Sequence, residues 1–209
     1  AGLLGVRAPA PGARTRCQAS PEAGNRRILE SPSRARWHGA SHDLGADVDA
    51  ITFHEPARMP RGFRCASRNC GLKREGPDLA LFYSEVPAAA AAVFTRNQFP
   101  GAPIIVGREL IRKGRLRAVV VNSKISNVGT GEEGIRNARR MGELAAAELG
   151  VPADEVLMSS TGLIGRQLPM DLIEAGLRGM AAELQDDPLR GAEGIMTTDT
   201  YPKAISLSV

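Results

Sequence analysis

Two short stretches of the sequence are rich in hydroxyl groups that could take part in catalysis. The first is MSSTGLIG, residues 158–165, in which a run of hydroxyl side chains ends at Thr161 and Gly162 follows. The second is GIMTTDTYPK, residues 194–203. Backbone N–H groups at a turn after a strand, with a threonine hydroxyl beside them, can stabilise an oxyanion, the negatively charged oxygen of an acyl-transfer intermediate. Each stretch alone is also a common Ser/Thr/Gly turn, so the pattern leaves open whether the two meet in one polar pocket.

The histidines and cysteines argue against other catalytic machinery. No histidine follows His54, so we expect no Ser-His-Asp or Cys-His site in the main body of the chain. His38 and His42 have the spacing of metal ligands but lie in an Arg/Ser/Pro-rich stretch without a helical pattern. The odd number of cysteines predicts no disulfide framework. We expect Cys65 and Cys70 to be buried thiols, because no second pair could complete a zinc site.

A glycine motif, GTGEEG at residues 129–134, matches the G-x-G-x-x-G pattern of dinucleotide-binding proteins. Five residues separate the apparent strand end at Ser123 from the first glycine, where a dinucleotide site needs a tight turn. Glu132 and Glu133 place negative charge where a pyrophosphate would bind. We therefore interpret the motif as a helix start with a Thr130–Glu133 capping box. A nucleotide-binding oxidoreductase is a distant alternative.

The elements that must position these residues follow from hydrophobic spacing. Short apolar runs bounded by Pro, Gly or charged residues predict strands. The sequence shows five such runs, at residues 79–84, 91–96, 103–107, 117–123 and 155–160. Helical spacing predicts one helix from the capping box to Gly150 and a second over residues 169–185. Several strands followed by helix, strand and helix predict a layered α/β domain.

Residues 1–45 differ from the rest and predict a disordered or targeting-like leader ahead of a domain over 46–209. The leader is rich in Ala, Pro, Arg, Gly and Ser, a composition shared by organellar transit peptides. Residues 1–41 hold seven arginines and two glutamates, so the other 168 residues, with 20 basic and 21 acidic side chains, net about −1. We therefore expect no nucleic-acid partner. The longest apolar run, residues 86–94, is too short to span a membrane.

Four ordered segments resemble the ornithine acetyltransferase family, the bifunctional glutamate/ornithine N-acetyltransferases of arginine biosynthesis. They are RGFRCASRNCGLKREGPDLALFYSEVPAAAAAVFTRNQFPGAPIIVGRE, AVVVNS, SSTGLIG and GIMTTDTYPK. They occur in the family's order over about residues 50–205. The resemblance implies an α/β layered sandwich of the type shared with self-processing aminopeptidases, built from an α and a β chain of one self-cleaving precursor. This chain corresponds to the α-chain region, incomplete without the β chain.

The resemblance also implies a mechanism. A threonine at the N-terminus of the β chain is the nucleophile, its own α-amine can serve as the base, and no cofactor is needed. Acetyl moves from N-acetylornithine to that threonine and then to glutamate. The oxyanion donors correspond to Thr161 and Gly162, and Thr197 matches a substrate-binding position. Asn127 is a further substrate-binding candidate. This chain stops before the nucleophile, so alone we expect it to be inactive and poorly soluble, with the β chain as its partner.

One departure from the family puts the substrates in question. Typical members read NSGNANACTG where this chain reads NSKISNVGTG, so Lys124 and Ile125 replace a glycine and an asparagine. Lys124 could pair with a substrate carboxylate or could be a solvated loop residue. An acyl hydrolase on the same framework and a non-catalytic fragment or paralogue stay as alternatives. We expect a cytoplasmic protein in a bacterium, or a mitochondrial or plastid one if the leader is a transit peptide.

Overall fold

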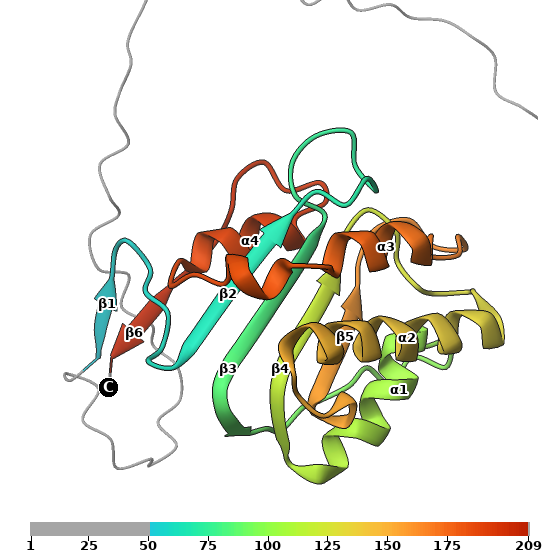
Figure 1. Cartoon of the computed structure of the whole chain (residues 1–209), viewed down its shortest axis with the longest axis horizontal. Helices are drawn as coiled ribbons and strands as arrows, with labels where there is room; N and C mark the ends of the chain where they lie inside the picture. Colours follow the sequence, from blue (N-terminus) through green and yellow to red (C-terminus); the bar gives the residue numbers. More distant parts are fainter. Residues whose placement is uncertain (1–50, 209) are drawn as a thin grey trace, which may run out of the picture. The chain divides into compact units, whose positions relative to one another are not determined.

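The computed structural model describes residues 51–208, which lie within one compact unit. A four-stranded sheet has the order β2-β3-β4-β5, and a separate two-stranded sheet joins β1 to β6 (Figure 1). The strands are β1 (Thr52–His54), β2 (Phe63–Arg68), β3 (Leu79–Ala89), β4 (Arg115–Asn122), β5 (Val156–Ser160) and β6 (Ser206–Ser208). The α-helices are α1 (Ala102–Leu110), α2 (Gly131–Leu149), α3 (Met170–Leu177) and α4 (Pro188–Ile195), with short 3-10 helices η2 (Ile111–Lys113), η3 (Ala153–Glu155) and η4 (Met180–Glu183).

The sheet is mixed, and its pairing explains where the chemistry-bearing turns lie. β2, β3 and β4 pair antiparallel, whereas β4 and β5 pair parallel, with Asn122 opposite Ser160 at their shared carboxyl end. Helix α2 makes the crossover between these two parallel strands. The loops that follow β4 and β5 therefore leave the sheet side by side, at the edge where open α/β sheets bind ligands.

The two faces of the sheet are covered by different helices. Leu79, Leu81 and Val120 belong to the main core together with side chains of α2 and α3. Because side chains alternate across a strand, Ala80 and Phe82 point to the opposite face. There they lie against Gly194 and Gly191 of α4, where a glycine lets the helix approach closely. The result is a mixed α/β fold, as the order of elements predicted.

Most predicted elements are present. Strands β3, β4 and β5 fall on the predicted runs 79–84, 117–123 and 155–160, although β3 continues to Ala89. Helix α2 ends at Gly150, which adopts the left-handed backbone conformation with φ of 65°. Within residues 51–208, no helix is both long and apolar enough to cross a membrane. The leader, Cys17, His38 and His42 lie outside the described residues.

Two predicted strands were wrong. Residues 103–107 form part of α1, which carries a proline in its first turn and buries Ala102, Pro103, Val106 and Gly107 on one side. A short apolar run fits a strand or a buried helix equally well, and the proline position favours the helix. Residues 91–96 have no regular secondary structure, and Val93 is fully exposed.

Two predictions about helices need correction. Thr130 is the N-cap residue of α2, but it forms no side-chain capping bond; its hydroxyl donates to Asn127 Oδ1. The predicted helix over 169–185 is split into α3 and η4. Gly179, with φ of 78°, lies between these two helices and is incompatible with a continuous α-helix. The sequence pattern also gave no indication of β2 or α4.

Candidate active site

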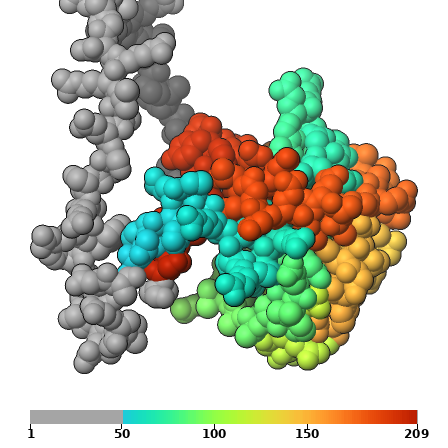
Figure 2. Space-filling view, turned by 60° about the vertical axis from the view of Figure 1, so that its left-hand side comes forward, coloured from blue at the N-terminus to red at the C-terminus, as the bar shows by residue number. Residues whose placement is uncertain are grey.

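The two hydroxyl-rich stretches meet at one cavity of about 780 Å³. Four of the five predicted site residues line it, namely Thr161, Gly162, Thr197 and Lys124. The remaining lining residues are Leu72, Lys73, Arg74, Glu75, Leu163 and Thr198. The segment 69–78, between β2 and β3, contributes several of these and stands out as a projection from the surface (Figure 2).

The turn after β5 places a candidate pair of oxyanion donors. The Thr161 N–H donates to Asn122 O at 3.0 Å, and the Leu163 N–H donates to Lys124 O at 3.0 Å. Between these two bonds, the Gly162 N–H and the Thr161 hydroxyl have no hydrogen-bond partner among residues 51–208. Gly162 has φ of 130°, and a side chain there would meet the Lys124 carbonyl. The site therefore needs glycine for its shape and leaves two donors available.

A buried amide holds this turn in place. Asn122 is fully buried; its Oδ1 accepts from Ser160 Oγ at 2.6 Å and its Nδ2 donates to Ile125 O at 2.7 Å. Ile125 in turn pairs with Leu163 in a parallel bridge that extends the β4–β5 pairing. Asn122 thus connects the end of β5 to the loop after β4, and both loops are held at the cavity.

The second hydroxyl-rich segment is attached to the site by two bonds across the fold. Ser123 Oγ donates to Gly194 O at 2.8 Å, and Lys73 Nζ donates to Met196 O at 2.6 Å. Thr197 follows directly and its N–H donates to Asp199 Oδ2 at 3.3 Å. The hydrogen bond from Lys203, together with that from Thr197, lowers the pKa of Asp199, so this carboxylate stays ionised.

Asp78 organises the projecting loop from inside. It is fully buried, its two carboxylate oxygens accept from Cys70 N and Lys73 N at 2.7 Å each, and its carbonyl accepts from Ser123 N at 2.8 Å. Asp78 therefore couples the loop that carries Lys73 to the loop that begins at Ser123. No periodicity in the sequence predicted this role.

Replacing Asp78 with alanine should lower the free energy of unfolding by about 3 kcal/mol or more, because two buried N–H groups lose charge-assisted partners. Thermal unfolding of the purified protein measures this loss. Glu75→Ala in the same loop is the control, since this exposed side chain should contribute within about 0.5 kcal/mol. Equal melting temperatures for the two variants would contradict the assigned role.

Neither Cys65 nor Cys70 lines the cavity. Burial raises the pKa of Cys65, and burial together with Asp78 raises that of Cys70 to about 12. Both cysteines are free thiols and stay protonated, so neither is suited to be a nucleophile. Burial lowers the pKa of Lys73; the charges of Asp78 and Asp199 oppose this shift, and that of Lys124 adds to it. Among the described residues, no group of three His, Cys, Asp or Glu side chains could hold a metal ion.

Asn127 does not line the cavity. Its side chain is fully buried, donates to Gly134 O at 2.8 Å and accepts from Thr130 Oγ1. A side chain at Gly134 would collide with the side chains of Thr130 and Asn127. The third glycine of the G-x-G-x-x-G motif therefore makes room for this network. Asn127 therefore fixes the start of α2, and its predicted contact with substrate finds no support in this geometry.

A mixed sheet with two candidate oxyanion donors after one strand and a hydroxyl-rich segment across the cavity is an arrangement suited to acyl transfer. Comparison with known proteins identifies the family of the chain. The ArgJ family model matches residues 64–209, and the chain belongs to this family. The predicted resemblance to the ornithine acetyltransferases is thereby confirmed.

Individual relatives give the extent of the match. The arginine biosynthesis bifunctional protein ArgJ of Thermotoga neapolitana is 48% identical over 153 residues, covering 72% of this chain and 38% of its own length. Its counterpart from Nitratidesulfovibrio vulgaris is 47% identical over 147 residues, covering 69% and 37%. This chain therefore spans well under half the length of these curated relatives.

Solved structures show the same fold. The ornithine acetyltransferase of Mycobacterium tuberculosis, solved in complex with ornithine, has a TM-score of 0.72 at 38% identity, covering 75% of this chain and 88% of that one. The arginine biosynthesis bifunctional protein ArgJ of Bacillus halodurans has a TM-score of 0.66 at 35% identity, covering 72% and 81%.

Proposed function

We propose that this chain supplies the oxyanion site and part of the substrate cavity of an acyltransferase in arginine biosynthesis. The complete protein moves an acetyl group from N-acetylornithine to glutamate. The observation that carries this proposal is the meeting of Thr161, Gly162 and Thr197 at one cavity. Membership of the ArgJ family and the likeness to a structure solved with ornithine support it.

The reaction is a double displacement. A threonine hydroxyl at the N-terminus of a β chain, outside this sequence, attacks the acetyl carbonyl carbon, and its own α-amine accepts the proton. The carbonyl oxygen becomes an oxyanion that the Thr161 hydroxyl and Gly162 N–H stabilise. The C–N bond then breaks, ornithine leaves with the proton, and the acetyl group stays as an ester on the threonine. The amine of glutamate attacks that ester through a second oxyanion, which gives N-acetylglutamate and restores the threonine.

Exposed apolar side chains beside the cavity support the proposal of a β-chain partner. Leu163 and Ile164 follow the oxyanion turn directly and are 51% and 66% exposed, and Phe99, near Ile164 across Gly129, is 66% exposed. Apolar groups gathered next to a site are typical of a surface that another polypeptide covers. We propose that the β chain covers this surface and completes a sandwich of the self-processing type.

Acetyl exchange tests the proposed function. The complete protein, given N-acetylornithine with an isotope-labelled acetyl group and unlabelled glutamate, should form labelled N-acetylglutamate much faster than labelled acetate. Faster release of acetate would instead identify a hydrolase. If neither product forms although the protein is folded, a non-catalytic paralogue is the better description.

A further inference from the structure

We propose that Lys124 is a specificity-determining residue that binds a carboxylate group of the acylated amino acid. This inference rests on the proposed function and adds to it a residue that selects among N-acyl amino acids by their negative charge. It depends on the backbone conformation of Lys124, on the charges around the cavity, and on the hydrogen bonds that hold Lys124 beside the turn after β5.

The backbone at Lys124 is suited to glycine. Its φ is 83°, and among residues 51–208 it is the one residue other than glycine with a positive φ. A side chain in this conformation is strained, and such residues gather at functional sites where surrounding structure holds them in place. The chain nevertheless carries a long cationic side chain here.

Neighbouring bonds hold Lys124 in this conformation. Its carbonyl accepts the Leu163 N–H at 3.0 Å and lies against Gly162, where a side chain would have no room. Lys124 is therefore joined directly to the oxyanion turn through its backbone. Any ligand group that its ammonium binds would be positioned relative to an acyl oxygen held by Thr161 and Gly162.

The side chain of Lys124 has no protein partner within the described part of the chain. It is exposed at the cavity and takes part in no hydrogen bond or ion pair there. Lys73, the other lysine of the cavity, already donates to Pro77 O and Met196 O. Lys124 is thus the lysine whose ammonium is available to a ligand.

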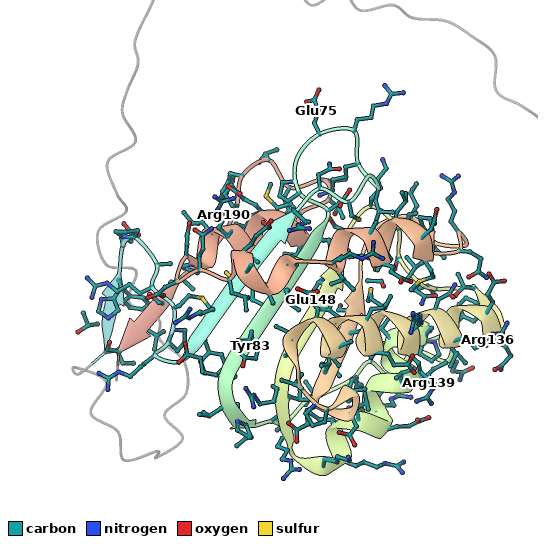
Figure 3. The ribbon with its side chains drawn as sticks, in the orientation of Figure 1. Glu75, Tyr83, Arg136, Arg139, Glu148 and Arg190 are labelled. Carbon is teal, nitrogen blue, oxygen red and sulfur yellow. The ribbon has the colours of Figure 1, made fainter. Side chains whose placement is uncertain are left out.

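The other charges near the cavity favour an anion. Among residues 51–208, Glu75 is the one acidic side chain that lines it, and it extends outward from the tip of the projecting loop (Figure 3). Lys73 and Lys124 line the same cavity, and the carboxylates of Asp78 and Asp199 act on the charge of Lys73. Lys124 has no ion-pair partner among residues 51–208, so a ligand carboxylate beside it supplies the missing counter-charge. An N-acyl amino acid offers such a carboxylate a few bonds from its acyl carbonyl.

Calorimetric titration of the complete protein tests this proposal with three probes: N-acetyl-L-glutamate, and its side-chain amide and α-amide, each of which lacks one carboxylate charge. The wild-type protein should bind one of the two amides about tenfold more weakly than N-acetylglutamate, the effect of losing one charge-assisted hydrogen bond.

The Lys124→Gly variant should bind N-acetylglutamate about tenfold more weakly than the wild-type protein does, and it should no longer discriminate against that amide. Arg136→Gln, which removes an exposed cation on α2 (Figure 3), is the charge-matched control and should bind like wild type.

Thermal unfolding separates binding from folding, because Lys124→Gly relieves the strained backbone and should raise the melting temperature by about 2–4 °C. Weaker binding by a more stable protein would show that the side chain is kept for the ligand. Unchanged discrimination in Lys124→Gly, with acetyl exchange intact in wild type, would overturn the role of Lys124 and leave the proposed function standing. Failure of the wild-type protein to bind any of the probes or to exchange acetyl would overturn both.

Discussion

Replacing Thr161 with valine is expected to lower kcat of the complete protein in the proposed acetyl transfer by about 10² to 10³ and to change KM little. Valine keeps the shape of threonine but removes the hydroxyl, one of the two donors available at the turn after β5. The oxyanion forms only along the reaction path, so losing a donor raises the barrier more than it weakens ground-state binding. Steady-state acetyl exchange between N-acetylornithine and glutamate measures both constants.

The fold should survive this change. The Thr161 hydroxyl has no hydrogen-bond partner among residues 51–208, so its loss leaves no buried group unpaired. Ser159→Ala is a suitable control, because this exposed hydroxyl lies two residues earlier on β5 and does not line the cavity. A Thr161→Val enzyme with the kcat of the control would show that the hydroxyl is not an oxyanion donor.

Replacing Gly162 with alanine should remove activity more completely and also destabilise the protein. The added methyl group would collide with the carbonyl carbon and oxygen of Lys124, and φ of 130° is strained for any residue with a side chain. The turn must move, which displaces the Gly162 N–H from the oxyanion. We expect kcat to fall by at least about 10² and the free energy of unfolding by about 1–3 kcal/mol.

A matched glycine separates the two causes. Gly114, between η2 and β4, has φ of 69° with nothing within 4 Å of an added methyl group, and it lies outside the cavity. Gly114→Ala should therefore show the cost of backbone strain alone, with acetyl exchange unchanged. If Gly162→Ala matched Gly114→Ala in both stability and kcat, the close packing at the turn would not matter for catalysis.

The sequence predicted secondary structure correctly where a residue pattern was compatible with one type of element only. The strands β4 and β5 were predicted from their short apolar runs. The amphipathic helix α2 was predicted because its hydrophobic spacing and the glycine that follows its last turn indicate the same helix. Helix α1 was misread because nine residues with a short apolar run fit two structures. The split between α3 and η4 depends on the backbone of Gly179, which a spacing pattern does not describe.

The same distinction holds at the site. Thr161, Gly162 and Thr197 were predicted from their motifs, and the structure adds that they line one cavity. Lys73 and Asp78 were missed, because their roles depend on contacts with Met196 and Ser123, far away in the sequence. Asn127 is buried and does not line this cavity, but a buried amide and a substrate-binding amide look alike in sequence. Only its bonds to Thr130 and Gly134 distinguish them.

Mass spectrometry of the acyl-enzyme tests the central claim most directly. The complete protein would be incubated with N-acetylornithine in the absence of glutamate, separated into its polypeptides, and measured by intact mass and N-terminal sequencing. We predict a polypeptide that begins with threonine and carries one acetyl group, which is lost on addition of glutamate and forms far more slowly in Thr161→Val. A protein that turns over N-acetylornithine without such a polypeptide, or that acetylates it at the same rate in Thr161→Val, would contradict the account.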